Sequence, residues 1–146
     1  MSNNRQTLKT IISSFTLKKE RLANDIKKLE NDSRKKQDSV NKFKSYIKEY
    51  QDKIFSHHAI SGSTLINHQF FLDKLTTAMH KEEDILTNLN DQQQQLIQQH
   101  NQLTIKIDGL TERLSNIEKN FALSLATKMD NEINELAVTR EMLNQE

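Results

Sequence analysis

The 146-residue sequence contains no cysteine, no proline and no tryptophan, and it has only two glycines. Without cysteine, the chain has no disulfide framework, no thiolate metal site and no cysteine nucleophile. With so little glycine and no proline, it lacks the turn residues that a fold of many short elements needs. Long helices are therefore expected, since a single interior glycine such as Gly109 costs a helix only about 1 kcal/mol relative to alanine.

Long apolar runs are missing too, and the mean hydropathy is -0.79. Residues 1–15 hold no apolar core of signal-peptide length. No segment approaches the roughly 20 apolar residues that cross a bilayer. We expect a cytoplasmic chain with no direct membrane insertion, whose association with any membrane runs through partners.

Charge is unevenly distributed, although the net charge is only +1. Residues 1–53 carry 14 Lys and Arg against 7 Asp and Glu, whereas residues 54–146 carry 7 against 13. Acidic residues interrupt the basic half, and no base-stacking motif accompanies it, so we expect no nucleic-acid binding. The favoured explanation is two helices of opposite charge that lie side by side.

Apolar residues recur at alternating spacings of three and four from Leu8 to Ile54, where 11 of 14 positions are apolar. A second such line runs from Leu65 to Ser124, with 13 of 18 positions apolar. This spacing is typical of a coiled-coil seam, the line of positions that faces a partner helix. Polar residues interrupt the seams at Lys19, Ser33, Lys36, His68, Glu82, Gln93, His100 and Ser124.

Residues 57–64 are predicted to form a turn between the seams. Gly62 can take positive φ there, and Ser61, Ser63 or Thr64 can cap the following helix. A short turn makes the two helices antiparallel. The predicted fold is all-α, a single domain over residues 1–146 that forms an antiparallel two-helix coiled-coil hairpin. Its first helix covers about 5–56, and its longer second helix covers about 65–142.

A bend centred near residue 60 places Leu8 opposite a residue near 112. The second helix then has no partner beyond about residue 116, and the spacing of its apolar residues changes phase after Phe121. The apolar positions of this unpaired end, called the terminal stripe below, are Phe121, Leu125, Met129, Ile133 and Leu136.

Candidate catalytic and metal-binding groups are few. His57 and His58 are adjacent and project in two directions, while His80 and Glu83 supply only two ligands on one helical face. The sequence has no P-loop, dinucleotide fingerprint or nucleophile elbow. We expect no enzymatic activity, no catalytic residue, no cofactor and no metal site.

A wide apolar face is predicted close to the turn, because Tyr46, Phe71 and Ala78 lie directly beside the seams. The register pairs Tyr50 with Phe71. It also pairs Tyr46 with Leu75, and Phe43 with Ala78. The face either broadens the core between the helices or binds another protein, and we favour binding because only two helices are available to cover it. We call this set the aromatic face: Phe43, Tyr46, Tyr50, Phe71, Leu75 and Ala78.

Three short motifs surround this face. They are Lys48-Glu-Tyr-Gln-Asp-Lys-Ile-Phe-Ser, then Ile60-Ser-Gly-Ser, then Leu65-Ile-Asn-His-Gln-Phe-Phe-Leu-Asp-Lys-Leu-Thr-Thr-Ala-Met. The arrangement resembles the FliJ family, with its E-Y arm, glycine-containing turn and I-N-x-Q-x-F-[IL]-x-x-L helix. The likeness covers about residues 8–140 in length and register, and its specific part is about 46–79.

The resemblance implies a stalk of the flagellar type III export apparatus, similar in fold to the central stalk of rotary ATPases. Its implied partners are the export ATPase hexamer, the export gate protein FlhA and export chaperones, with peripheral association to the inner membrane. The aromatic face would bind the gate, and we assign the terminal stripe to the ATPase ring. Two alternatives stay open, the equivalent stalk of a virulence-type injectisome and a generic structural coiled coil. Phe70-Phe71 after Ile66-Asn67 favours the flagellar version.

Overall fold

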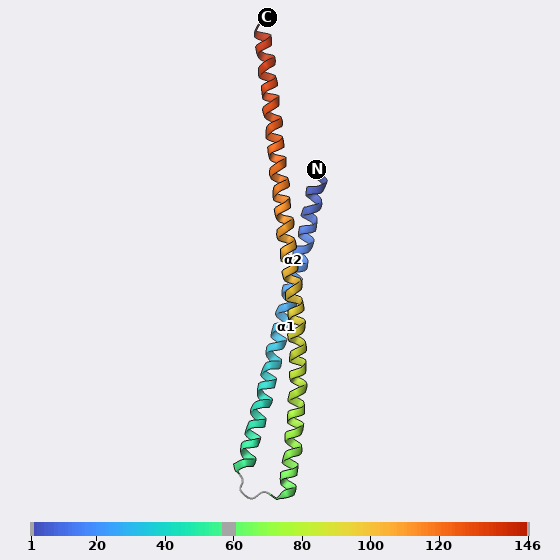
Figure 1. Cartoon of the computed structure of the whole chain (residues 1–146), viewed down its shortest axis with the longest axis vertical. Coiled ribbons are helices and arrows are strands. Elements are labelled where there is room, and N and C mark those ends of the chain that lie inside the picture. Colours follow the sequence, from blue (N-terminus) through green and yellow to red (C-terminus); the bar gives the residue numbers. More distant parts are fainter. Residues whose placement is uncertain (1, 57–60, 146) are drawn as a thin grey trace. The chain divides into compact units, whose positions relative to one another are not determined.

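The computed structural model describes residues 2–56 and 61–145, and both elements in this part of the chain are helices (Figure 1). Helix α1 spans Ser2–Ser56 and helix α2 spans Gly62–Asn144, with lengths of 55 and 83 residues. Together they form a helical hairpin, which confirms the predicted all-α fold and its longer second helix. In the described ranges, neither helix has a segment long and apolar enough to cross a membrane.

A serine cap marks the start of α2. Ser61 Oγ accepts a hydrogen bond from the backbone N–H of Thr64 at 3.3 Å, and the Ser61 carbonyl accepts one from the N–H of Leu65 at 3.0 Å. The first bond satisfies an N–H group that a helix leaves unpaired in its first turn, and the second is the first regular hydrogen bond of α2, which the carbonyl of a cap residue accepts. Ser61 is therefore the cap among the three candidates.

Gly62 differs from the prediction. It is the first residue of α2, and neither glycine of the described ranges has a positive φ. The proposed left-handed conformation was wrong, because the chain enters α2 through the Ser61 cap with Gly62 already helical. The remaining residues of the predicted turn, 57–60, lie outside the described part of the chain.

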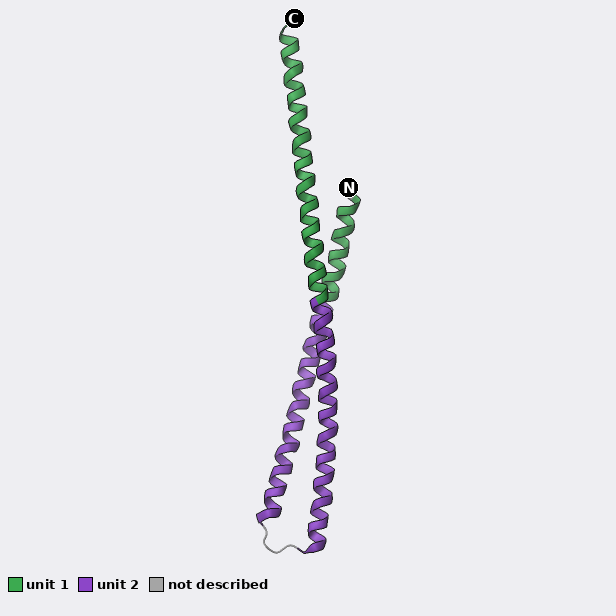
Figure 2. Cartoon of the chain, in the orientation of Figure 1, with its two compact units in different colours: residues 1–19, 102–146 green, residues 20–101 purple. Residues whose placement is uncertain are grey.

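The two helices form two compact units (Figure 2). Unit 1 contains Met1–Lys19 and Gln102–Glu146, and unit 2 contains Glu20–Asn101. Each unit therefore combines one segment of α1 with one segment of α2. Two of the polar interruptions of the seams lie at these boundaries, Lys19 at the boundary in α1 and His100 close to the boundary in α2.

In unit 2 the segments of α1 and α2 are antiparallel. Lys36 Nζ lies 2.7 Å from Glu82 Oε2. Nearer the turn, the centroids of the Tyr50 and Phe71 rings are 4.7 Å apart. Partner numbers fall along α2 as numbers rise along α1, so the antiparallel pairing is confirmed, and with it the predicted contact of Tyr50 with Phe71.

In unit 1 the pairing extends further along α2 than predicted. Lys9 Nζ lies 3.7 Å from Glu118 Oε1, and the Arg5 guanidinium lies 5.7 Å from the centroid of the Phe121 ring. Side chains of a helix lean toward its N-terminus. Lys9 and Arg5 therefore reach toward higher residue numbers on α2, past the residue 116 at which pairing was expected to stop. The part of α2 beyond these contacts begins at residue 122.

The predicted seams are the least exposed lines on both helices. Every seam position of α1 from Leu8 to Ile54 is buried or half-buried, and so is every seam position of α2 from His68 to Ile117. At its ends the α2 seam is shorter than predicted, because Leu65, Phe121 and Ser124 are exposed. Among the residues whose burial is described, the buried side chains are Leu8, Leu22, Ser33, Val40 and Leu103, and Val40 retains only 1% of its accessible surface.

Candidate functional site

The described ranges contain no group of three or more His, Cys, Asp or Glu side chains placed to hold a metal ion. His80 Nδ1 and Glu83 Oε2 are 3.7 Å apart on one exposed face of α2, as their spacing predicts. His57 and His58 lie outside the described residues. The candidate sites within the described residues are the two surfaces predicted to bind proteins.

Tyr50 is the centre of the aromatic face. Its ring contacts Phe71 and also meets His68 edge-on, with centroids 5.1 Å apart. The Tyr50 hydroxyl and His68 Nδ1 share a hydrogen bond. Both partners belong to α2, so this cluster joins the two helices of unit 2 and fixes the position of Phe71.

The outer part of the aromatic face is open to solvent. Tyr46 is 57% exposed and Phe71 is 47% exposed. The other members of the face, Phe43, Tyr50, Leu75 and Ala78, are half-buried. The inner four residues therefore broaden the contact between α1 and α2, whereas the outer two present aromatic rings that this contact leaves uncovered.

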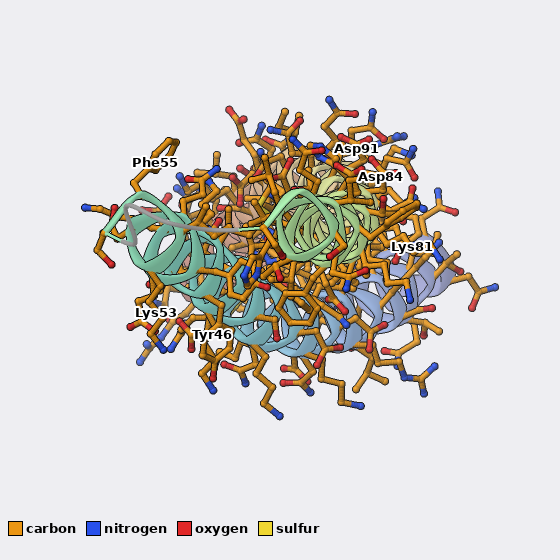
Figure 3. The ribbon with its side chains drawn as sticks, turned by 90° about the horizontal axis from the view of Figure 1, so that it is seen from below. Tyr46, Lys53, Phe55, Lys81, Asp84 and Asp91 are labelled. Carbon is orange, nitrogen blue, oxygen red and sulfur yellow. The ribbon has the colours of Figure 1, made fainter. Side chains whose placement is uncertain are left out.

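Two further aromatic residues near the turn were not assigned to a binding surface from the sequence. Phe55 is exposed and points away from α1 on the side opposite Tyr46 (Figure 3), because nine residues correspond to two and a half helical turns. Phe70 is exposed as well, and it lines a shallow hollow on α2 together with Lys74, Ala78 and Lys81. Phe70 thus extends the aromatic face, and Phe55 lies apart from it. Their positions outside the seam were the sequence signal that could have shown these aromatic side chains to be exposed.

A polar layer inside the seam was also missed. Lys36 and Glu82, which had been identified only as interruptions, form an ion pair with side-chain exposures of 35% and 24%. Ser33, one turn away on α1, is buried, and its hydroxyl has no hydrogen-bond partner among the described residues. Polar groups at such positions cost stability and favour one register of pairing. Lys36 and Glu82 carry opposite charges and lie at similar distances in sequence from the turn, and this was the signal that could have revealed the ion pair.

The terminal stripe lies on α2 in unit 1, and its members are all exposed. All residues from 121 to 145 are exposed on every side of the helix. Phe121 carries the Arg5 guanidinium on its ring, so it belongs to the margin of the paired region. Just beyond, a hollow is lined by Ile117, Asn120, Phe121, Ser124, Leu125 and Lys128.

Comparison with known proteins gives no match, either to a protein-family model, to a curated protein or to a solved structure. The case for a function consequently rests on the residues and their geometry. Among the described residues, the outer part of the aromatic face and the terminal stripe both carry large apolar side chains that are exposed.

Proposed function

We propose that the chain is a non-enzymatic stalk protein of the flagellar type III export apparatus. In this proposal unit 2 binds the export gate protein FlhA through the aromatic face, and unit 1 engages the export ATPase hexamer through the terminal stripe. The hairpin also handles export chaperones. It stays in the cytoplasm and associates peripherally with the inner membrane through the gate.

The observation that supports the proposal most strongly is the exposure of Tyr46 and Phe71 around the Tyr50 cluster. These residues lie within 46–79, the segment that carries the FliJ resemblance. Exposed aromatic groups that cluster on one face concentrate binding energy in protein interfaces. A structural spacer needs no such face near its turn, so this observation favours a binding protein over a generic coiled coil.

The terminal stripe supports the second contact. Leu125, Met129 and Ile133 repeat every four residues along the segment of α2 after Phe121, which no described residue of unit 1 covers. An amphipathic helix gains most of its stability from covering its apolar face against another element. A ring that encloses the end of α2 would provide that cover.

The flagellar and injectisome versions share this architecture. Phe70 and Phe71 following Ile66-Asn67 favour the flagellar version, since Phe70 enlarges the aromatic face beyond the inner cluster. Binding to the flagellar gate protein, compared with the gate protein of an injectisome from the same cell, separates the two.

The proposal is tested with the purified chain, the gate protein and the export ATPase. Combining Tyr46→Asp with Phe71→Ala should weaken gate binding by about 30-fold or more, equivalent to about 2 kcal/mol, and leave ATPase stimulation intact. Truncation after Phe121 should abolish ATPase stimulation and leave gate binding intact. Ile105→Ala serves as the control, because Ile105 is exposed yet belongs to neither surface. Parental gate affinity in the double variant would eliminate the aromatic face as the gate-binding site.

A further inference from the structure

We infer that residues 122–144 of α2 form a docking surface for a cationic amphipathic helix of a partner protein. The inference refines the proposed function and rests on it for the identity of the partner, the ATPase ring. The chemistry of the surface follows from three observations on unit 1, namely an apolar stripe, acidic flanks and the basic cover that α2 already has.

The apolar stripe continues beyond the paired region. Leu125, Met129, Ile133 and Leu136 follow one another at spacings of four, four and three, and beyond Leu136 the same line passes through Arg140 before it reaches Leu143. Their exposures run from 49% at Leu125 to 70% at Leu136. Because this spacing keeps the side chains on one face, the stripe offers a seam that one more helix can fill.

Acidic residues lie on both sides of this stripe. Glu132 is three residues from Met129 and four from Leu136, which places it next to them on one side. Asp130 is three residues from Ile133 and lies on the other side. Residues 122–145 contain four acidic and two basic residues in total. A helix seated on the stripe would therefore bring its own flanking residues against carboxylates.

Where α2 is covered in unit 1, its cover is a basic helix. Residues 1–19 contain four basic and no acidic residues. Lys9 pairs with Glu118, and Arg5 lies over the ring of Phe121. The cover therefore combines apolar packing with a cation on a carboxylate and another on an aromatic ring. Past residue 121 the same helix continues with the same kind of surface, and no described residue covers it.

The hollow lined by Phe121, Ser124 and Leu125 opens where this cover stops. It gives an incoming helix a place to start packing in continuation of α1. A second copy of the chain fits less well, because its stripe would bring acidic flanks against acidic flanks. An anionic lipid surface is disfavoured for the same reason.

The test uses the full chain and two synthetic helical peptides of about seven turns, long enough to be helical when bound. Both carry the same leucine and isoleucine seam, one with lysine flanks and the other with glutamate flanks. Fluorescence anisotropy should show the lysine peptide binding at least about tenfold more tightly than the glutamate peptide. Raising the sodium chloride concentration from about 50 mM to about 300 mM should weaken binding of the lysine peptide several-fold, because salt screens exposed charges.

Variants locate the binding. Ile133→Asp should abolish binding of the lysine peptide, and Asp130→Asn combined with Glu132→Gln should weaken it about threefold to tenfold. Ile105→Asp is the matched control, an exposed isoleucine of α2 outside the stripe, and should leave binding unchanged. Equal binding of the two peptides, or binding that survives Ile133→Asp, would overturn the inference.

Two more measurements separate the possible occupants and the two proposals. Sedimentation velocity should show no self-association that depends on Ile133. A dimer that forms in the parental chain and is lost in Ile133→Asp would identify a second copy as the occupant and overturn the inference. Selective binding of the lysine peptide without ATPase stimulation by the chain would refute the proposed ring contact and leave the surface chemistry standing. ATPase stimulation that persists in Ile133→Asp, without peptide binding, would refute the inference and leave the proposed function standing.

Discussion

The part of α2 that ends at Phe121 and the part that follows it carry apolar residues at similar helical spacings but differ in what covers them. From His68 to Ile117 every seam position of α2 is buried or half-buried. From residue 122 to residue 145 every position is exposed. The spacing thus shows that a helix has an apolar face, and within the described residues only the part of that face that packs against α1 is covered.

Covered and exposed apolar residues also lie on opposite sides of α2 within the part that pairs with α1. Leu103 is buried in the seam, whereas Ile105, two residues later, is exposed. Two residues turn the side chain to the far side of a helix, where the described part of the chain has no third element. In a two-helix fold, therefore, position relative to the seam determines whether an apolar residue contributes to folding or remains available for binding.

The largest expected effect on stability comes from replacing a valine by aspartate, compared between the covered and the uncovered part of the hairpin. Val40→Asp should lower the free energy of unfolding by about 3–5 kcal/mol, because a carboxylate would replace the most buried side chain of the chain. Val138→Asp places the same carboxylate on the exposed end of α2 and should change the free energy of unfolding by less than about 0.5 kcal/mol. Urea unfolding followed by circular dichroism measures both. Equal losses for the two variants would remove the distinction between covered and uncovered parts.

A second comparison separates the seam from the aromatic face. Leu103→Ala should cost about 2–3 kcal/mol of stability because it leaves a cavity in the seam. Phe71→Ala should cost less than about 1 kcal/mol, since nearly half of the ring is already exposed, yet it should weaken gate binding by about 2 kcal/mol.

Thermal melting and titration with the gate protein, carried out on both variants, test this pair of expectations. Leu103→Ala should melt lower and bind normally, and Phe71→Ala should do the reverse. Normal gate binding by Phe71→Ala, accompanied by a large loss of stability, would instead make the aromatic face part of the core.

The sequence predicted the seams well because burial in a two-helix hairpin follows directly from helical periodicity. Even the polar interruptions, such as Lys36 and His68, proved to be half-buried seam positions. The partners of those polar groups were not predicted. Pairing depends on register, and a turn without proline or a left-handed glycine does little to specify register. The protein-binding roles of Tyr46 and Phe71 stay predictions, because a binding role depends on the surface of the partner as well as on this chain.

The ion pair between Lys36 and Glu82 allows the register to be tested directly. A double-mutant cycle with Lys36→Met and Glu82→Leu should give a coupling of about 1 kcal/mol, a modest value because both side chains keep some contact with water. Lys9 and Glu118 are more exposed and more widely separated, so their cycle should give at most about 0.5 kcal/mol. The double replacement Lys36→Met with Glu82→Leu should be at least as stable as either single variant. A coupling for Lys9 with Glu118 that equals or exceeds the one for Lys36 with Glu82 would contradict this order.

The smallest expected effect concerns the two glycines, which differ in position within α2. A methyl group at Gly109 would meet no atom within 4 Å, and the same holds at Gly62. Gly109 lies deep inside α2, so Gly109→Ala should stabilise the chain by about 0.5–1 kcal/mol through helix propensity and a less flexible unfolded state. Gly62 is the first residue of α2, next to the Ser61 cap, where propensity counts for less, and Gly62→Ala should change stability by less than about 0.3 kcal/mol. Equilibrium unfolding of both variants at one protein concentration provides the measurement. A destabilising Gly109→Ala would mean that another element packs against that side of α2 in solution, and the division into covered and uncovered faces would then have to be redrawn there.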